Sequence, residues 1–170
     1  YAQRAKNVSG SAIRALFSVA SRPEVVSLAG GMPYVQALSM DHMADVAARV
    51  VREQGARALQ YGSGQGDIHL REQILDITAE VGVRAHPDDI IVTTGSQMAL
   101  DLVTRTFCDP GDVVLVESPS YVGALGVFRS YECDIVHVAM DDDGLVPNAL
   151  RETIESVRAQ GKRIKLCLLY

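Results

Sequence analysis

Apolar residues recur along this chain with two different spacings, and segments of the two kinds alternate. Four short and mostly apolar runs predict buried strands, because a strand covered on both faces presents apolar side chains at nearly every position. The runs are residues 90–94, 113–117, 135–139 and 164–169. Between them, apolar positions three and four residues apart predict amphipathic helices at residues 96–108, 119–131 and 147–160. Strands that alternate with helices pair in parallel through right-handed crossovers, so the pattern predicts an α/β protein with a mostly parallel sheet.

The stretch before the first of these strands is predicted to be helical in three places. Residues 11–20 are expected to form one helix. A second is expected to take Asp41 as its N-cap, to run to about residue 53 and to end at Gly55. A third follows Asp67 and is closed by Gly82. Apolar stripes at this spacing are core packing, so these helices indicate structure rather than chemistry.

The junction between the first strand and the helix after it is the first candidate site. An apolar strand enters a turn at Gly95 and Ser96, and Gln97 opens the helical pattern. The N–H groups of a first helical turn lack intrahelical partners and carry the positive end of the helix dipole, so a phosphate monoester docks there naturally. Gly95 lets the backbone approach closely, and Ser96 adds a hydroxyl. The same residues also fit a plain turn with an N-cap, and this stretch alone leaves both interpretations open.

The next strand ends in an aromatic residue. The run at 113–117 is followed by Pro119 and then by Tyr121. Since ligands collect at the carboxyl ends of parallel strands, Tyr121 is expected near the phosphate that Gly95 to Gln97 would hold. A flat ring beside a phosphate suggests a flat cofactor.

Five ordered blocks give the chain a family resemblance. They are Ser27 to Pro33 (SLAGGMP), Gln60 to Gly62 with Leu70 and Arg71 after it, Thr94 to Gln97 (TGSQ), Asp109 to Asp112 (DPGD) and Glu117 to Tyr121 (ESPSY). Over nearly its whole length the chain resembles the fold-type I pyridoxal-phosphate-dependent aminotransferases, in the branch of the 2-aminoadipate, kynurenine and aromatic or branched-chain enzymes. The resemblance implies an aspartate aminotransferase-like fold, with three α/β/α layers around a mostly parallel sheet that is incomplete here. It also implies pyridoxal 5'-phosphate as cofactor, and an L-amino acid and a 2-oxo acid as substrates.

The same resemblance implies roles for particular residues at the cofactor. Ser96 and Gln97, with Gly95, would bind the cofactor phosphate, and Tyr121 would stack on the pyridine ring. Tyr61 would reach the phosphate held by the neighbouring subunit, which implies a homodimer.

Roles at the substrate follow from the resemblance in the same way. Gly30 and Gly31 would bring the backbone close to the substrate carboxylate. Arg14 would contact substrate side chains from a mobile N-terminal helix. An arginine on an amphipathic helix is more often simply part of a solvated face, and both interpretations of Arg14 stay open.

No catalytic residue is assigned in this chain, because the lysine that the family needs is not in it. Fold-type I chemistry requires an ε-amino group that forms a Schiff base with the cofactor and then moves the α-proton. Lys6 lies before the first predicted helix, and Lys162 and Lys165 lie in a polar approach to the last strand, where solvated charge is expected. We interpret the chain as an N-terminal portion that is inactive alone. Residues 1–40 would be an arm and small-domain segment, and residues 41–170 the first part of the large cofactor-binding domain.

Composition excludes several other classes of protein. The 16 basic and 21 acidic residues give a net charge of −5 without the basic stripe that nucleic acids require, so no nucleic acid is expected as a partner. No apolar run approaches the ~18 residues of a membrane-spanning helix, so no membrane is expected either. Three widely spaced cysteines, Cys108, Cys133 and Cys167, predict reduced core thiols and a cytoplasmic location. The four histidines lack the paired spacing of a ligand set, so no metal is expected.

The function predicted for the full-length protein is transfer of an amino group from an L-amino acid to a 2-oxo acid. Two alternatives share the same blocks. One is a transcriptional regulator with an aminotransferase-like sensing domain, which would carry a winged helix-turn-helix upstream. The other is a lyase or decarboxylating synthase on the same scaffold, which differs in the α-bond that is broken.

Overall fold

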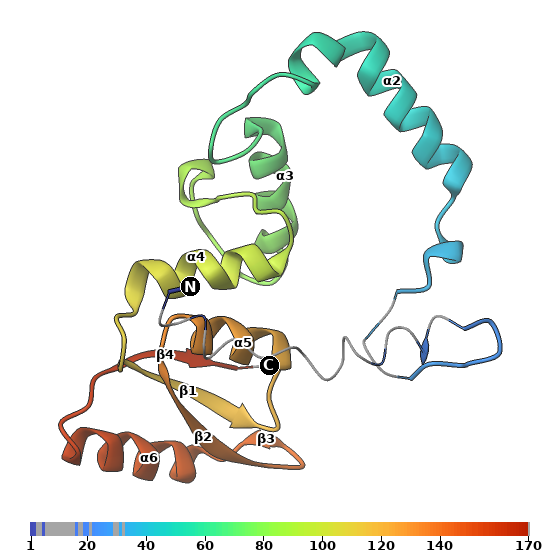
Figure 1. The fold of residues 1–170 in the computed structure, drawn as a ribbon. Helices are drawn as coiled ribbons and strands as arrows, with labels where there is room; N and C mark the ends of the chain where they lie inside the picture. The colour runs from blue at the N-terminus through green and yellow to red at the C-terminus, as the bar shows by residue number, and fades with distance from the viewer. Residues whose placement is uncertain are drawn as a thin grey trace. The chain divides into compact units, whose positions relative to one another are not determined.

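The computed structural model describes residues 1–2, 5, 16, 19–20, 22–28, 31 and 33–169 (Figure 1). They belong to two compact units, one made of residues 1–30 and 94–170 and the other of residues 31–93. Most of the helix predicted at 11–20 lies outside the described residues, as do Arg14 and Gly30.

A four-stranded sheet forms the centre of the unit that contains residues 94–170. Its strands are β1 (Val113–Ser118), β2 (Asp134–Asp141), β3 (Gly144–Leu145) and β4 (Ile164–Leu168), in the order β3-β2-β1-β4. β1 is parallel to both β2 and β4, which confirms the predicted parallel arrangement. The short β3 was not expected from the sequence. It folds back antiparallel along the end of β2, with Met140 opposite Leu145.

Helices cover both faces of this sheet and make three layers. Alternate residues of β1 point to opposite faces. Val114 and Val116 belong to a core cluster with residues of α5 (Val122–Ser130) and with Leu100 of α4 (Ser96–Phe107). Val113 and Leu115 belong to a second cluster, with residues of α6 (Pro147–Ala159). Figure 1 shows α5 and α6 on opposite sides of the sheet. Such double coverage explains why β1 is apolar at four consecutive positions.

The strand predicted at residues 90–94 is wrong. These residues follow a 3-10 helix, η3 (Pro87–Asp89), and Ile90 is extended, with φ −110° and ψ 133°. Val92, however, donates its N–H to the carbonyl oxygen of Gln65 at 2.8 Å, and Gln65 lies in a loop. An apolar run becomes a strand only where another strand accepts its hydrogen bonds, and the sheet of the described residues contains β1 to β4 alone.

The unit formed by residues 31–93 is helical. It contains η2 (Val35–Ala37), α2 (Met40–Ala58), α3 (Ile68–Ala79) and η3. α3 follows Asp67 as predicted, and Asp67 is its N-cap, since its carboxylate accepts hydrogen bonds from the N–H groups of His69 and Leu70. Left-handed Gly82, with φ 85°, follows the end of α3.

The predicted ends of α2 are both displaced. Ser39, rather than Asp41, is the N-cap, and its hydroxyl accepts from the N–H of His42 at 3.4 Å. Asp41 lies in the first turn instead, where a carboxylate still favours the helix dipole. The helix also passes Gly55 and ends at Ala58. A single glycine costs about 1 kcal/mol inside a helix, which does not suffice to stop one.

The cysteines agree with the prediction only in part. All three are free thiols, and Cys108 and Cys133 are buried. Burial raises the pKa of both, that of Cys133 to about 12. The prediction of a core thiol is wrong for Cys167, which is exposed on β4.

Ion pairs join β1 and β4 near the points where the two strands begin. Arg163 donates from Nε to Oδ1 of Asp112 at 2.8 Å and from Nη2 to Oδ2 of Asp109 at 3.2 Å. The hydrogen bond from Arg163 is the main cause that lowers the pKa of the Asp112 carboxyl. The pKa of Arg163 is raised by the same pair.

Asp112→Asn is therefore expected to change how stability depends on acid. The pKa of Asp112 is lower in the folded than in the unfolded chain, so its carboxylate stabilises the fold when the pH is above the ordinary pKa of an aspartate. This stabilisation is lost as the pH falls below about 4. Circular dichroism during acid titration should show a shallower loss of stability in Asp112→Asn than in the wild type. The exposed Asp142→Asn is the control. If Asp112→Asn lost stability in acid as steeply as the wild type, the stabilising role of the Asp112 carboxylate would be contradicted.

Candidate cofactor site

The first part of the site is the N-terminus of α4. Gly95 is its N-cap, with φ 79° and ψ 164°, and no side chain caps the helix by a hydrogen bond. The φ value lies in the region that favours glycine, and a Cβ placed on Gly95 would meet no atom within 4 Å. The first turn is thus open toward a ligand and keeps the positive end of its dipole. This is the local arrangement in which helices bind anions.

The second part is Tyr121, which is the N-cap of α5. It follows β1 after a cis peptide bond between Ser118 and Pro119. Its ring lies over Gly123, because a Cβ on Gly123 would come within 2.5 Å of the ring atom Cζ. Gln97 joins the two helices, since its Nε2 donates to the carbonyl oxygen of Gly123 at 3.3 Å. Through Gly123, one contact therefore connects α4 to the backbone beneath the Tyr121 ring.

A hollow of about 320 Å³ lies between these two parts, at the carboxyl ends of β1 and β4. It is lined by Ser96, Leu100, Glu117, Ser120, Tyr121, Leu168 and Leu169. Small-molecule sites have volumes of this order and combine apolar walls with a few placed polar groups. The carboxyl ends of parallel strands are also where ligands of α/β proteins bind.

Two polar residues of this hollow were given no role from the sequence. Glu117 is only 5 % exposed, so it is a buried carboxylate in the wall of the hollow. Ser120 contributes a hydroxyl. Their place at or just beyond the carboxyl end of a buried apolar run was the signal that could have identified both.

A second contact holds α4 and α5 together farther along the two helices. The hydroxyl of Tyr131, at the end of α5, donates to Oδ1 of Asp101 in α4 at 3.0 Å. Asp101 was given no catalytic role from the sequence. Together with the contact between Gln97 and Gly123, the contact between Tyr131 and Asp101 holds α4 against α5, with both helix N-termini at one end of the sheet.

The structure brings together four of the predicted site residues. Ser96 and Tyr121 line the same hollow, Gly95 precedes Ser96, and Gln97 contacts Gly123. Tyr61 belongs to the other unit, where its side chain is fully exposed.

Of the predicted substrate residues, only Gly31 lies among those that the structure describes. Gly31 belongs to the unit of residues 31–93 and is left-handed, with φ 60°. Gly30 and Arg14 lie outside the described residues. Lys162 pairs with Asp134 at 2.8 Å, in agreement with its predicted role as a surface charge.

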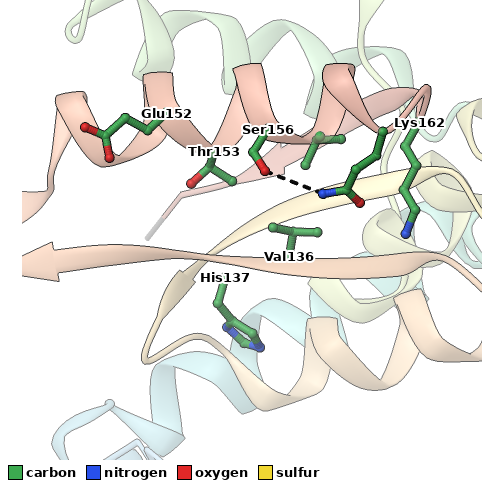
Figure 2. A pocket seen from close by; sticks show the side chains of 8 residues that line it. Val136, His137, Glu152, Thr153, Ser156 and Lys162 are labelled. Atoms are coloured by element: carbon green, nitrogen blue, oxygen red, sulfur yellow. Dashed lines mark hydrogen bonds between the residues drawn. The ribbon is translucent and has the colours of Figure 1, made fainter.

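A second hollow lies on the α6 side of the sheet and includes His137 and Lys162 (Figure 2). Its polar side chains Glu152, Thr153 and Ser156 lie along α6, as Figure 2 shows.

Within the described ranges, no group of three or more His, Cys, Asp or Glu residues is placed to hold a metal ion. No helix there is long and apolar enough to cross a membrane.

With this geometry in place, comparison with known proteins identifies the class. The sequence model described as aminotransferase class I and II matches residues 23–169, and the chain belongs to that family. Aromatic-amino-acid aminotransferase 1 of Thermococcus litoralis is 34% identical over 167 residues, which are 98% of this chain and 40% of that protein. The 2-aminoadipate transaminase of Thermus thermophilus is 37% identical over 158 residues, 93% of this chain and 38% of that enzyme.

The fold is confirmed by a solved relative. The structure of Pyrococcus horikoshii kynurenine aminotransferase, a complex with PMP, matches with a TM-score of 0.88 and 32% identity over 99% of this chain and 42% of that one. This chain therefore has part of the aspartate aminotransferase-like α/β fold, as the sequence predicted. It spans about two fifths of the length of these relatives.

Proposed function

We propose that this chain supplies the phosphate and ring contacts for pyridoxal 5'-phosphate in an aminotransferase. The whole protein would move an amino group from an L-amino acid to a 2-oxo acid. The observation that carries the proposal is that Ser96, in the first turn of α4, and Tyr121, the N-cap of α5, line one hollow at the carboxyl end of β1. Membership of the aminotransferase family supports it.

The residues present fit this cofactor. Gly95 to Gln97 offer an anion the positive end of a helix with no side-chain cap, and the space above Gly95 is open. The half-exposed Tyr121 ring offers a flat apolar surface to a pyridine ring. When bound, the cofactor supplies an electron sink for a bond at the α-carbon of the substrate. The chain's own part is to hold and orient it.

The larger assembly follows from the same proposal. Residues 41–170 would be the first part of the large cofactor-binding domain, and residues 1–40 the N-terminal arm and a segment of the small domain. Gly30, Gly31 and Arg14 would contact the substrate. The full exposure of the Tyr61 ring supports a contact with a neighbouring subunit, and so a homodimer.

Two further parts of the proposal concern the residues that this chain lacks and its cellular location. The catalytic lysine and the carboxylate-binding arginine would lie in other parts of the whole protein, so this chain alone would be inactive. The free thiols of Cys108 and Cys133 support a reducing, cytoplasmic location.

The test is the absorbance spectrum of the full-length protein with the cofactor and a panel of L-amino acids. We expect a visible cofactor band that one class of amino acid converts and that a 2-oxo acid restores. A band that no amino acid converts would favour the sensing domain of a regulator instead. Absence of any cofactor band after incubation with pyridoxal phosphate would contradict the proposal.

Ser96→Ala adds a test of the site itself. We expect about tenfold weaker cofactor affinity, because the variant removes one hydrogen bond to a charged phosphate. Ser130→Ala is the matched control, since its hydroxyl bonds the carbonyl oxygen of Val127 near the other end of α5. Equal affinities of both variants and the wild type would exclude Ser96 from the phosphate site.

A further inference from the structure

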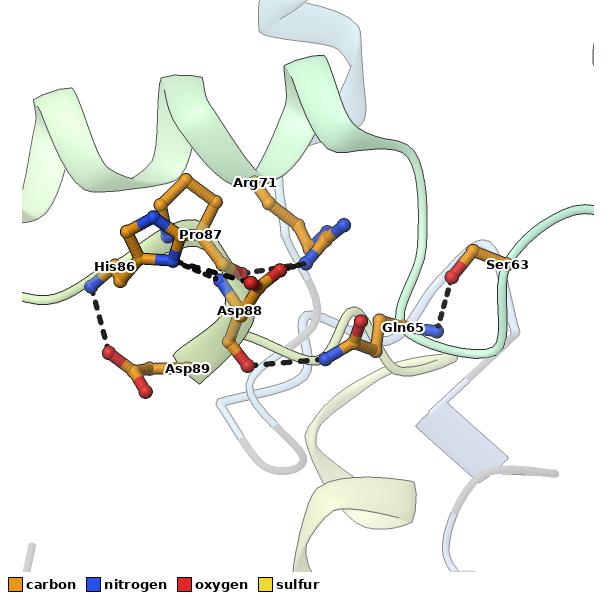
Figure 3. A network of polar contacts seen from close by, with 7 residues as sticks. All are labelled: Ser63, Gln65, Arg71, His86, Pro87, Asp88 and Asp89. Atoms are coloured by element: carbon orange, nitrogen blue, oxygen red, sulfur yellow. Dashed lines mark hydrogen bonds and ion pairs between the residues drawn. The ribbon is translucent and has the colours of Figure 1, made fainter.

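Arg71 is a buried cation in a mostly exposed helix. It is the one buried residue of α3 among those described, at 6 % exposure. Its Nη1 donates to the carbonyl oxygen of Pro87 at 2.7 Å and lies 3.4 Å from Oδ1 of Asp88 (Figure 3). Its buried Nε has no hydrogen-bond partner within the described part of the chain. A guanidinium so incompletely paired costs free energy on burial, which argues that its position serves more than stability.

The turn that Arg71 contacts is itself held in one conformation. The backbone N–H of His86 donates to Oδ2 of Asp89 at 2.8 Å, and that of Asp88 donates to Nδ1 of His86 at 3.3 Å. These two bonds form a capping box around η3. Arg71 therefore binds a rigid turn rather than a loose loop.

The same turn holds the glycine-rich segment at residues 61–66. Gln65 donates from Nε2 to the carbonyl oxygen of Asp88 at 3.1 Å, as Figure 3 shows. Its own carbonyl oxygen accepts the N–H of Val92 at 2.8 Å. Gly66 next to it has φ 100°, and a Cβ there would lie 2.7 Å from Val92 Cβ. Both contacts place the segment directly against the chain that follows η3.

Hydrogen bonds inside the segment fix it as far back as Ser63. Ser63 accepts from the N–H of Gln65 through its hydroxyl at 3.2 Å and from the N–H of Gly66 through its carbonyl oxygen at 3.1 Å. Tyr61 lies two residues before Ser63, and its ring is fully exposed. A segment with glycines at three of its six positions would otherwise have many conformations.

We propose that Arg71 is a positioning residue for Tyr61. Its guanidinium holds the turn at residues 86–89, the turn holds Gln65, and Gln65 sets the segment that begins with Tyr61. In one respect this rests on the proposed function, namely that Tyr61 contacts the cofactor phosphate. Arg71 touches neither cofactor nor substrate in this scheme.

Amide hydrogen exchange in the full-length protein tests whether Arg71 and Gln65 hold residues 61–66 in place. In Arg71→Lys and in Gln65→Ala we expect exchange at residues 61–66 to be roughly tenfold faster, as for the loss of one protecting hydrogen bond. Exchange in α4 should stay unchanged. Glu72→Gln, at the exposed neighbouring position of α3, is the matched control. Gln65→Ala keeps the test valid if Arg71→Lys unfolds. Wild-type exchange at residues 61–66 in both variants would overturn the proposal.

Cofactor affinity tests whether the effect passes through Tyr61. Arg71→Lys and Tyr61→Phe are each expected to weaken affinity for pyridoxal phosphate about tenfold, and the double variant no more than the stronger single one. A merely structural Arg71 would lower the melting temperature and leave this affinity alone. Additive losses in the double variant would contradict coupling through Tyr61.

The two measurements separate the two proposals. If Tyr61→Phe weakens cofactor binding but exchange at residues 61–66 is unaffected by Arg71→Lys and Gln65→Ala, the role of Arg71 is wrong and the proposed function stands. If no cofactor binds to the wild type, the proposed function fails, while hydrogen exchange still decides whether Arg71 holds the segment.

Discussion

Replacing Gly123 by alanine is expected to displace the ring of Tyr121 and weaken cofactor binding roughly tenfold or more. A Cβ at this position would lie 2.5 to 2.7 Å from three atoms of the Tyr121 side chain, a separation that Cβ atoms in proteins essentially never show. These atoms belong to the far end of a flexible side chain, so the ring moves and the helix stays. Stacking of a flat heterocycle on an aromatic side chain is worth about 1–3 kcal/mol by alanine substitution, which sets the scale of the loss.

Gly126→Ala provides the control for this experiment in the same helix. A Cβ on Gly126 meets nothing within 4 Å, so the substitution tests the gain in helix propensity without the clash. Cofactor titration of Gly123→Ala, Gly126→Ala and Tyr121→Ala should give weak, wild-type and weak binding, respectively. Wild-type affinity in Gly123→Ala beside a loss in Tyr121→Ala would mean that the bound protein does not hold the ring over Gly123.

Leu115→Ala is expected to lower the free energy of unfolding by about 2–5 kcal/mol, the range for emptying a packed core position. Leu115 is 1 % exposed in the middle of β1 and packs with Val138 and residues of α6. β1 is hydrogen-bonded on both sides, which holds the strand in place when the side chain is shortened. The loss would be a large part of the stability of an ordinary domain.

Urea unfolding of the full-length protein measures this loss. Leu59→Ala is the control, because it makes the same chemical change at a side chain that is 79 % exposed. We expect Leu59→Ala to change the free energy of unfolding by about 0.5 kcal/mol or less. Similar losses in the two variants would contradict the central place of β1 in the core.

Local signals in the sequence account for most of the elements. The apolar run at Val113 to Val116 is a strand because α-helices cover both of its faces, and such coverage leaves a continuous apolar run in the sequence. Asp67 caps α3 because its side chain needs only the N–H groups two and three residues ahead. The start of α4 at Gly95 and Ser96 was also visible, since glycine and serine favour a turn and an N-cap through their own chemistry.

Contacts between distant residues decided the rest. Residues 90–94 have the composition of a strand, but the Val92 N–H bonds the loop residue Gln65, which lies far back in the sequence. The exposure of Cys167 depends on what packs beside β4, and no local pattern records that.

For the site, the residue types and their order could be read from the amino-acid sequence. Gly95, Ser96, Gln97 and Tyr121 could be named because each follows an apolar run, and the carboxyl ends of parallel strands meet at one edge of a sheet. Three contacts became known only from the packed fold: the Tyr121 ring lies over Gly123, Gln97 joins α4 to α5, and Arg71 is buried against Pro87. The last two contacts join residues that are 26 and 16 positions apart in the sequence. The first joins residues only 2 positions apart, but it depends on the direction in which the Tyr121 ring points. Periodicity along the chain reports which face of an element is buried, whereas side-chain direction and long-range pairing appear only after the elements have packed.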